Sequence, residues 1–124
     1  MANLEMFKKE QYINVETFRK NGVGVKTPVW FVEVNGELCF TTEPYSGKVK
    51  RMHNNPVVNV APCKMDGTVT GDWVPASVRF MQGDEIQVFD KLYSKKYGLM
   101  KVLFELPKLF SKKPERSFIA IKLQ

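Results

Sequence analysis

The chain has 124 residues, a formal net charge of +6 and an apolar fraction of 44%. This length is typical of one domain with a modest core, so we expect a single domain over residues 1–124. No apolar run approaches the roughly 20 residues that span a bilayer, and the first residues contain no apolar signal core, so we expect a cytoplasmic protein without a membrane partner.

The excess of positive charge points to an anionic partner, which could be nucleic acid, a membrane surface or an anionic cofactor. The basic residues gather at residues 48–51, 95–96 and 108–116. Only the first cluster adjoins a glycine and the start of a predicted helix, and it is therefore the candidate anion site.

The two cysteines and the single histidine predict no metal centre. Cys39 and Cys63 lie inside strand-like runs, so we expect reduced, buried thiols, and nothing in their spacing supports a disulfide. The chain has no CxxC pattern. His53 falls near the end of a short predicted helix, where a cationic imidazole would suit the helix dipole, which is a structural role.

The first elements are predicted to be a short helix and a β-hairpin. Residues 4–11 place apolar side chains on one side of a helix, and residues 12–19 are rich in β-branched and aromatic residues, as strands are. Asn21-Gly22 predicts a tight turn, because a type I′ turn needs positive φ at both central positions. A second strand follows over residues 24–34.

This second strand is apolar on both faces, so both faces must be covered. One cover is the domain core, and the other is a second layer, a partner subunit or a flat ligand. Pro28 fits only at a sheet edge or a bulge, which leaves a row of free backbone groups near Thr27. A flat heteroaromatic ring could use those groups, or the segment is a kinked barrel strand with no ligand.

The remaining pattern predicts further strands joined by tight turns. Turns are expected at Asn35-Gly36, Asp66-Gly67 and Gly83-Asp84. The strands are expected at residues 37–42, 57–63, 68–81, 85–89 and 117–123. The strand over 68–81 is long and contains Gly71 and Pro75, which indicates a bend at a barrel corner. Six or seven short strands with hairpin turns favour a small β-barrel.

One long helix is predicted late in the chain, from an Asp90 cap to about residue 106. Tyr93, Tyr97, Met100 and Phe104 recur at helical spacing. Such a stripe is typical of core or subunit packing rather than of a cofactor site. Residues 109–116 are basic and are expected to form a loop or a helix end.

The stretch TEPYSGKVKRMHNNP, residues 42–56, predicts a strand end, a turn and a short helix. Ser46 is a good N-cap, and Gly47 lets the backbone approach a bound group closely. Lys48 is unexpected in the first turn of a helix, where the dipole disfavours a cation by a few tenths of a kcal/mol. A phosphate would reverse that sign and engage Lys48 and Arg51, which share one helix face. The alternative is a solvated basic turn.

These motifs resemble the pyridoxamine 5′-phosphate oxidase-like family of flavin-binding split-barrel proteins, in particular its small branch of flavin- or deazaflavin-dependent enzymes. The resemblance is carried by TPVWFVEVNGELCFTTEPYSGKVKRMHNNPVVNVAPCKMDGTVTGDWV, residues 27–74, and by KKYGLMKVLFEL, residues 95–106. It covers most of the chain. The order of the TPVWF and SGKVKR segments is its most specific feature.

The resemblance implies a mainly β fold, a split β-barrel of six to seven antiparallel strands with short flanking helices. It implies a homodimer with cofactor sites at the subunit interface, and FMN or a deazaflavin coenzyme as the cofactor. The residues implied to hold the phosphate are Ser46, Gly47 and Lys48, with Arg51 as a helper. The residues implied to lie along the ring system are Thr27, Pro28, Val29 and Trp30.

The implied activity is that of an oxidoreductase with a small-molecule redox substrate. No side chain stands out as a catalytic acid, base or nucleophile, as expected where the cofactor carries the chemistry. The chain is shorter than the vitamin-pathway oxidase of the family and lacks its C-terminal extension, so we do not expect oxidation of pyridoxamine phosphate. Pro28 and the basic stretch at 108–116 could serve the acidic tail of a deazaflavin, whereas FMN is smaller and more widespread.

Two other functions remain open at this point. A non-catalytic protein on the same barrel could bind flavin or haem as a sensor or carrier. A basic barrel could instead bind single-stranded nucleic acid, but here the aromatic residues fall in stripes that look buried, which disfavours a nucleic-acid partner.

Overall fold

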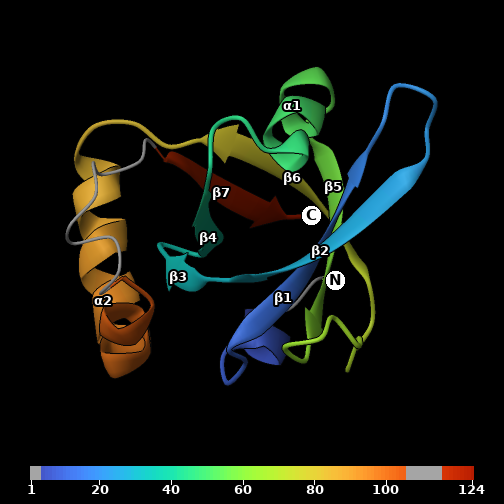
Figure 1. The fold of residues 1–124 in the computed structure, drawn as a ribbon. Coiled ribbons are helices and arrows are strands. Elements are labelled where there is room, and N and C mark those ends of the chain that lie inside the picture. Colours follow the sequence, from blue (N-terminus) through green and yellow to red (C-terminus); the bar gives the residue numbers. More distant parts are fainter. Residues whose placement is uncertain (1–3, 106–115) are drawn as a thin grey trace.

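The structure is a computed structural model that describes residues 4–105 and 116–124 (Figure 1). Seven strands pair antiparallel within these residues, in the order β2-β1-β5-β6-β7-β4-β3. The elements are η1 (Leu4–Phe7), β1 (Tyr12–Phe18), β2 (Gly24–Trp30), β3 (Val32–Val34), β4 (Glu37–Thr42), α1 (Gly47–Asn54), β5 (Val57–Cys63), β6 (Val74–Phe80), α2 (Asp84–Glu105) and β7 (Ser117–Leu123).

The sheet curls into a half-open barrel. Its two outermost strands, β2 and β3, are consecutive in the chain and are separated only by Phe31. The curl brings the two ends of the sheet together at this residue, and Figure 1 shows β2 running across the molecule into β3. The predicted split barrel with six to seven antiparallel strands is therefore confirmed. The single strand predicted over residues 24–34 is wrong, because it is divided at Phe31 into β2 and β3.

The barrel encloses the main core. Alternate residues of the strands point inward, so Ile13 lies opposite Val29 and Phe40 lies opposite Ile119. Helices add further apolar side chains to this core. The largest fully buried side chains of this main core are Phe7, Ile13, Val15, Phe31, Leu38, Phe40, Met52, Val58, Val60, Ile119 and Ile121.

The long helix α2 covers the outer face of β3, β4 and β7, and in Figure 1 it stands beside the barrel. It begins at Asp84, so the strand predicted at residues 85–89 is wrong and Asp90 is not the cap. Alternating polar and apolar residues there imitate a strand, but Phe89 continues the helical stripe of Tyr93 and Tyr97 and is fully buried. Helical φ/ψ angles are interrupted at Gly98, where φ is 30°.

Other local predictions are corrected by tertiary packing. The predicted strand over residues 68–81 is reduced to β6, and before it Val69 forms only an isolated bridge with Cys63. Gly71 packs closely on Pro62, where a Cβ would lie 2.7 Å from the proline ring. The helix predicted over residues 4–11 is a single 3₁₀ turn. The side chains of Met100 and Phe104 and the predicted structure of residues 106–115 lie outside the described residues.

The backbone angles of two predicted turns and the state of the two cysteines test further predictions. Asn35 and Gly36 both have positive φ, as a type I′ turn requires, whereas at the Asn21-Gly22 turn only Gly22 does, so the type I′ prediction is wrong there. Cys39 and Cys63 are free and buried, as expected. Burial raises the pKa of the Cys39 thiol to about 12 and that of the Cys63 thiol to about 11. None of the described helices is long and apolar enough to cross a membrane.

Candidate functional site

The helix α1 begins as its sequence predicts. Ser46 is the N-cap, with extended φ and ψ of −67° and 153°, and its Oγ accepts a hydrogen bond of 3.4 Å from the amide of Val49. Asn55 is the C-cap, and its amide donates to the carbonyl of Arg51. The buried face of the helix is formed by Val49 and Met52. Both ends of this helix are therefore set by local sequence.

Arg51 folds back along α1 towards its first turn. Its Nε donates a 2.6 Å hydrogen bond to the Oγ1 of Thr17 on β1. The side chain of Thr17 is buried on the inward face of that strand. A Cβ added to Gly47 would lie 2.7 Å from Arg51 Nη1. The guanidinium thus lies against Gly47, and the missing side chain of that glycine makes room for it.

Lys48 and Arg51 place two partly buried cations at the positive end of α1. Burial is the main cause that lowers the pKa of Lys48, with the charge of Arg51 next and Glu43 opposing. Burial and then the charge of Arg19 lower the pKa of Arg51. The ion pairs formed within the described residues involve neither Lys48 nor Arg51. A bound anion would relieve both like-charge repulsion and the unfavourable dipole.

The ring-binding residues predicted on β2 are divided between two faces of the sheet. Thr27 lies opposite Val15, and Val29 opposite Ile13, so both point toward the barrel interior. Pro28 lies on the other face and near Gly67. Across the described residues β2 pairs only with β1, which confirms that Pro28 occupies an edge strand, as its missing amide requires.

Trp30 lies on the outer face with an aromatic cover. Its ring stacks on Tyr97 of α2, with centroids 4.6 Å apart and planes at 11°, and it also contacts Tyr93 and Tyr12. The strand over residues 24–34 was predicted to need a cover on each face, and at Trp30 the helix α2 covers the outer face. One face of the Trp30 ring is occupied by Tyr97.

Thr27 and the α1 cluster lie on the same side of the sheet. Thr17 is opposite Val25, two residues from the Val15–Thr27 pair, so Thr27 and Thr17 are diagonal neighbours at roughly 7–8 Å. The structure thus brings Ser46, Gly47, Lys48 and Arg51 together, with Thr27 nearby. It does not bring Pro28 or Trp30 to the same face.

Sequence reasoning missed Thr17 and Arg19. Thr17 continues the inward-facing series of Ile13 and Val15, so a hydroxyl at the end of an apolar stripe was the available signal. Arg19 follows directly in the β1–β2 turn, and its charge acts on Arg51. Neither could be assigned to α1 without the tertiary contact.

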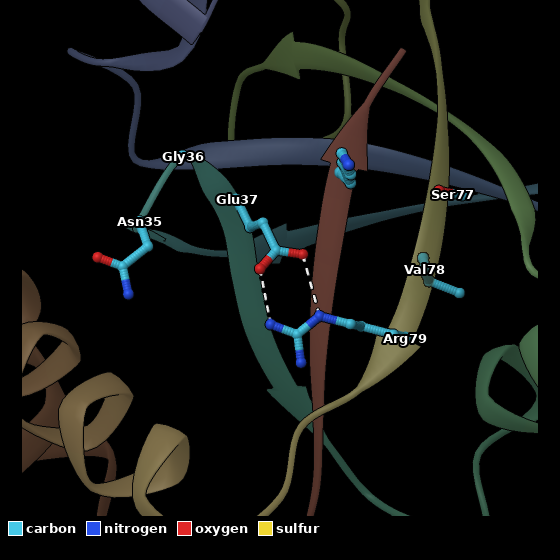
Figure 2. Close-up of a pocket in the computed structure, with 7 residues that line it drawn as sticks. Asn35, Gly36, Glu37, Ser77, Val78 and Arg79 are labelled. Carbon is cyan, nitrogen blue, oxygen red and sulfur yellow. Dashed lines mark hydrogen bonds and ion pairs between the residues drawn. The ribbon is translucent and has the colours of Figure 1, made fainter.

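A different polar hollow, of about 440 Å³, opens on the outer face of β4, β6 and β7 (Figure 2). Its main charged group, Arg79, donates bidentate hydrogen bonds to Glu37 and also to Glu85 of α2. These carboxylates raise the pKa of Arg79, and Arg79 in turn lowers the pKa of Glu85. The Arg79 charge is already balanced, unlike that of Lys48 and Arg51.

The sequence matches no protein-family model, and it matches no curated protein. Solved structures do show the same fold. An F420 reductase is 15% identical, with a TM-score of 0.61 over 100% of this chain and 94% of that one. The haem storage protein HutZ of Vibrio cholerae is 10% identical, with a TM-score of 0.66 over 97% and 86% of the two chains.

A third similar structure is a Listeria innocua protein named after pyridoxamine 5′-phosphate oxidase. It is 11% identical, with a TM-score of 0.66 over 98% of this chain and 90% of that one. At these identities the similarity establishes the fold alone. The chain has the split-barrel fold of pyridoxamine 5′-phosphate oxidase-like proteins, a fold that occurs in an F420 reductase and in haem-binding proteins.

Proposed function

We propose that this chain binds the phosphate of FMN or of a deazaflavin coenzyme at the start of α1, and that it acts as an oxidoreductase on a small-molecule substrate. The observation that carries the proposal is the pair of partly buried cations, Lys48 and Arg51, at the positive end of a helix with no carboxylate paired to them among the described residues. This arrangement favours a phosphate.

Each residue of the site has a distinct part in holding the phosphate. The Ser46 hydroxyl already accepts from the Val49 amide, so its proton is free to donate to a phosphate oxygen. Arg51 uses Nε for Thr17, which leaves its two terminal nitrogens for a bidentate contact. Lys48 supplies a point charge.

The ring of a bound flavin or deazaflavin supplies the electron or hydride transfer. The protein's own contribution is to bind and orient that ring. Thr27 shares the barrel side of the sheet with the phosphate site, and the free edge of β2 offers backbone donors and acceptors. We therefore keep Thr27, Pro28, Val29 and Trp30 as proposed ring contacts, with Pro28 and Trp30 contributing through their backbone.

The binding test compares FMN with riboflavin, which lacks the phosphate. Lys48→Ala and Arg51→Ala should each weaken FMN binding about tenfold or more, because a charge-assisted hydrogen bond contributes about 1.5–3 kcal/mol. Their effect on riboflavin should be small. Lys50→Ala is the matched control, since Lys50 is exposed on the same helix. Equal FMN affinity in wild type and both variants would refute the phosphate site.

The enzymatic part of the proposal needs a separate assay. We expect the protein loaded with FMN or a deazaflavin to be reduced by a nicotinamide donor and reoxidised by an artificial acceptor. Binding without any turnover would favour a sensor or carrier.

The second candidate function is non-catalytic haem binding, which the haem-binding neighbours support. His53 is the only histidine of the chain. It is exposed in the last turn of α1 and stacks on Phe80, with centroids 4.1 Å apart. A haem titration followed at the Soret band, with His53→Ala as the variant, distinguishes this function from flavin binding.

A homodimer with the cofactor between its subunits is part of the proposal, on the family resemblance. Apolar side chains that remain exposed near β5, at Val57 and Met65, are compatible with a subunit contact. Sedimentation analysis of the protein with and without FMN tests it, and a monomer under both conditions would contradict it.

A further inference from the structure

Four aromatic side chains that can be oxidised meet where β1, β2 and α2 come together. The Trp30 ring is at their centre, and its centroid lies 4.6 Å from that of Tyr97, 6.0 Å from Tyr93 and 6.3 Å from Tyr12. Such distances are ordinary for packed aromatic pairs. Packing alone would be served by phenylalanine, as it is at Phe89 in the same cluster, but phenylalanine does not give up an electron as readily as a phenol does.

The Tyr97 phenol is the closest of the three to Trp30, but no base is placed to take its proton. Its oxygen accepts a hydrogen bond from the Phe31 amide and lies 2.7 Å from the Gln11 carbonyl and 2.8 Å from the Phe31 carbonyl. A peptide carbonyl accepts a hydrogen bond but is too weak a base to remove the proton of a phenol. A neutral tyrosyl radical forms only when that proton leaves, so Tyr97 is a poor final electron donor despite its stacking.

Tyr12 differs from the other two tyrosines in its access to water. Its side chain is partly exposed, whereas Tyr93 and Tyr97 are only 9% and 3% exposed. Among residues 4–105 and 116–124, no hydrogen bond holds the Tyr12 phenol. Water can therefore take the phenol proton when the ring loses an electron.

We propose that Trp30 and Tyr12 form an outlet for oxidising equivalents, in which an electron from Tyr12 restores Trp30 after a one-electron oxidant has attacked it. The ring contact of 6.3 Å across the β1–β2 pair and the exposure of Tyr12 carry this proposal. The outlet moves the oxidised site from the packed Trp30 ring to a residue that external reductants can reach. It starts with any one-electron oxidant and needs no bound cofactor, so it stands apart from the proposed function.

The transfer is balanced as two one-electron steps. The oxidant takes one electron from the indole of Trp30, and the oxidised indole loses its N–H proton, which leaves a neutral radical. Tyr12 then returns one electron to this radical, while the indole nitrogen regains a proton from water and the Tyr12 phenol loses its proton to water. The products are the reduced oxidant, an intact Trp30, a neutral tyrosyl radical at Tyr12 and one released proton.

The test is pulse radiolysis of the cofactor-free full chain with azide radicals, which oxidise tryptophan in preference to tyrosine. The absorption of the tryptophan radical should decay as that of a tyrosyl radical rises, at a rate that does not depend on protein concentration, as expected for transfer within one molecule. Tyr12→Phe should remove most of the tyrosyl signal and prolong the tryptophan radical. Tyr97→Phe and Tyr93→Phe should retain the transfer.

Trp73 is the matched control, because it is the other tryptophan of the chain and is also partly exposed. Its ring lies 5.3 Å from the Nζ of Lys26, and among the described residues it has no tyrosine as a ring partner. Trp73→Phe should therefore retain the transfer. In Trp30→Phe the Trp73 radical should form and decay without a matching rise of the tyrosyl signal.

Two results would overturn the proposal. One is a wild type, or a Trp73→Phe variant, in which the tryptophan radical decays without giving a tyrosyl radical. The other is a tyrosyl signal that survives in Tyr12→Phe and is lost in Tyr97→Phe, which would make the stacked phenol the donor.

The position of the radical can also be checked without any substitution. A nitroso spin trap followed by peptide mass spectrometry of the oxidised wild type should place the adduct on Tyr12, and an adduct on Tyr93 or Tyr97 instead would count against the outlet. Tyr12→Phe keeps the aromatic ring, so its thermal unfolding midpoint should stay close to that of the wild type.

Discussion

Arg51 connects the first turn of α1 with the barrel wall. Its guanidinium binds Thr17 on one side and lies against Gly47 on the other. The long side chain would otherwise be free in water, so this fixed position reduces the entropy that a phosphate contact must overcome. At the scale of single residues, the proposed anion site therefore depends on two small neighbours as much as on its cations.

Gly47→Ala should weaken FMN binding about fivefold while leaving stability unchanged or slightly higher. The new Cβ would lie 2.7 Å from Arg51 Nη1, so the guanidinium must move, whereas alanine itself is a better helix former than glycine. Flavin titration and thermal unfolding measure the two effects. In an Arg51→Ala background the same substitution should have no further effect on affinity, and two additive losses would contradict this mechanism.

Thr17→Val should lower both the free energy of unfolding, by about 1–2 kcal/mol, and the affinity for FMN. Valine keeps the shape of threonine but removes the acceptor for Arg51 Nε, inside the barrel. Thr41→Val is the control, because Thr41 Oγ1 donates to the carbonyl of Ser117 on β7 rather than binding a residue of α1. Urea unfolding should show a loss in both variants, and only Thr17→Val should alter FMN binding; a change in both would count against the specific role of Thr17.

At the scale of elements, the sequence was sufficient where the deciding interactions are local. Ser46 and Asn55 cap α1 through residues three or four positions away, and the helix was predicted correctly. The start of α2 was missed because residues 85–89 alternate like a strand. These residues form a helix rather than a strand because Phe89 packs on the outer face of the sheet and Glu85 binds Arg79. Both are tertiary contacts.

The break between β2 and β3 was also beyond local reasoning. The Phe31 amide, which a continuous strand would use in its ladder, donates to the hydroxyl of Tyr97, 66 positions away. The same hydroxyl lies 2.7 Å from the carbonyl of Gln11 and 2.8 Å from that of Phe31. No pattern within residues 24–34 could indicate this partner.

Tyr97→Phe should destabilise the protein by about 1–3 kcal/mol although phenylalanine is the more apolar residue. It leaves the buried Phe31 amide without its acceptor while preserving the stacking on Trp30. Tyr45→Phe is the control, because Tyr45 is 80% exposed and should change stability by less than about 0.5 kcal/mol. Chemical denaturation measures the free energy of unfolding of both variants. If Tyr97→Phe were as stable as the wild type, the hydrogen bond between the Tyr97 hydroxyl and the Phe31 amide would not contribute to stability.

At the scale of the whole molecule, the barrel is a fold that this chain shares with proteins of different functions. The same fold occurs in an F420 reductase and in a haem storage protein, so the architecture alone does not determine what is bound. The alternation and turns of the sequence predicted a small barrel of six or seven strands, and the structure has seven within the described residues. The segment proposed to bind phosphate could be picked out from the sequence alone, but the division of the TPVW residues between two faces followed only from the register of β1 and β2.

The free energy of unfolding should depend on pH in the alkaline range, because the two thiols and Lys96 have shifted pKa values. The thiols and Lys96 change stability in opposite directions. The pKa of Cys39 is raised to about 12 and that of Cys63 to about 11, above the ordinary value near 8.5. Between about pH 9 and 11 the folded chain thus retains protons that the unfolded chain has lost, so this contribution to stability falls as pH rises. Lys96, with its pKa lowered to about 8, acts in the opposite direction, because the unfolded chain then holds the extra proton.

A comparison of wild type with the Cys39→Ala/Cys63→Ala double variant isolates the cysteine contribution, since both proteins contain Lys96. The variant loses some packing at every pH, because both side chains are buried. Its deficit in free energy of unfolding should shrink from pH 8 to pH 10.5, as only the wild type is penalised by thiols that must stay protonated when folded. Urea unfolding at the two pH values, with a reductant present, measures the deficit. A deficit that stays constant would mean that the thiols ionise in the folded barrel as readily as in the unfolded chain.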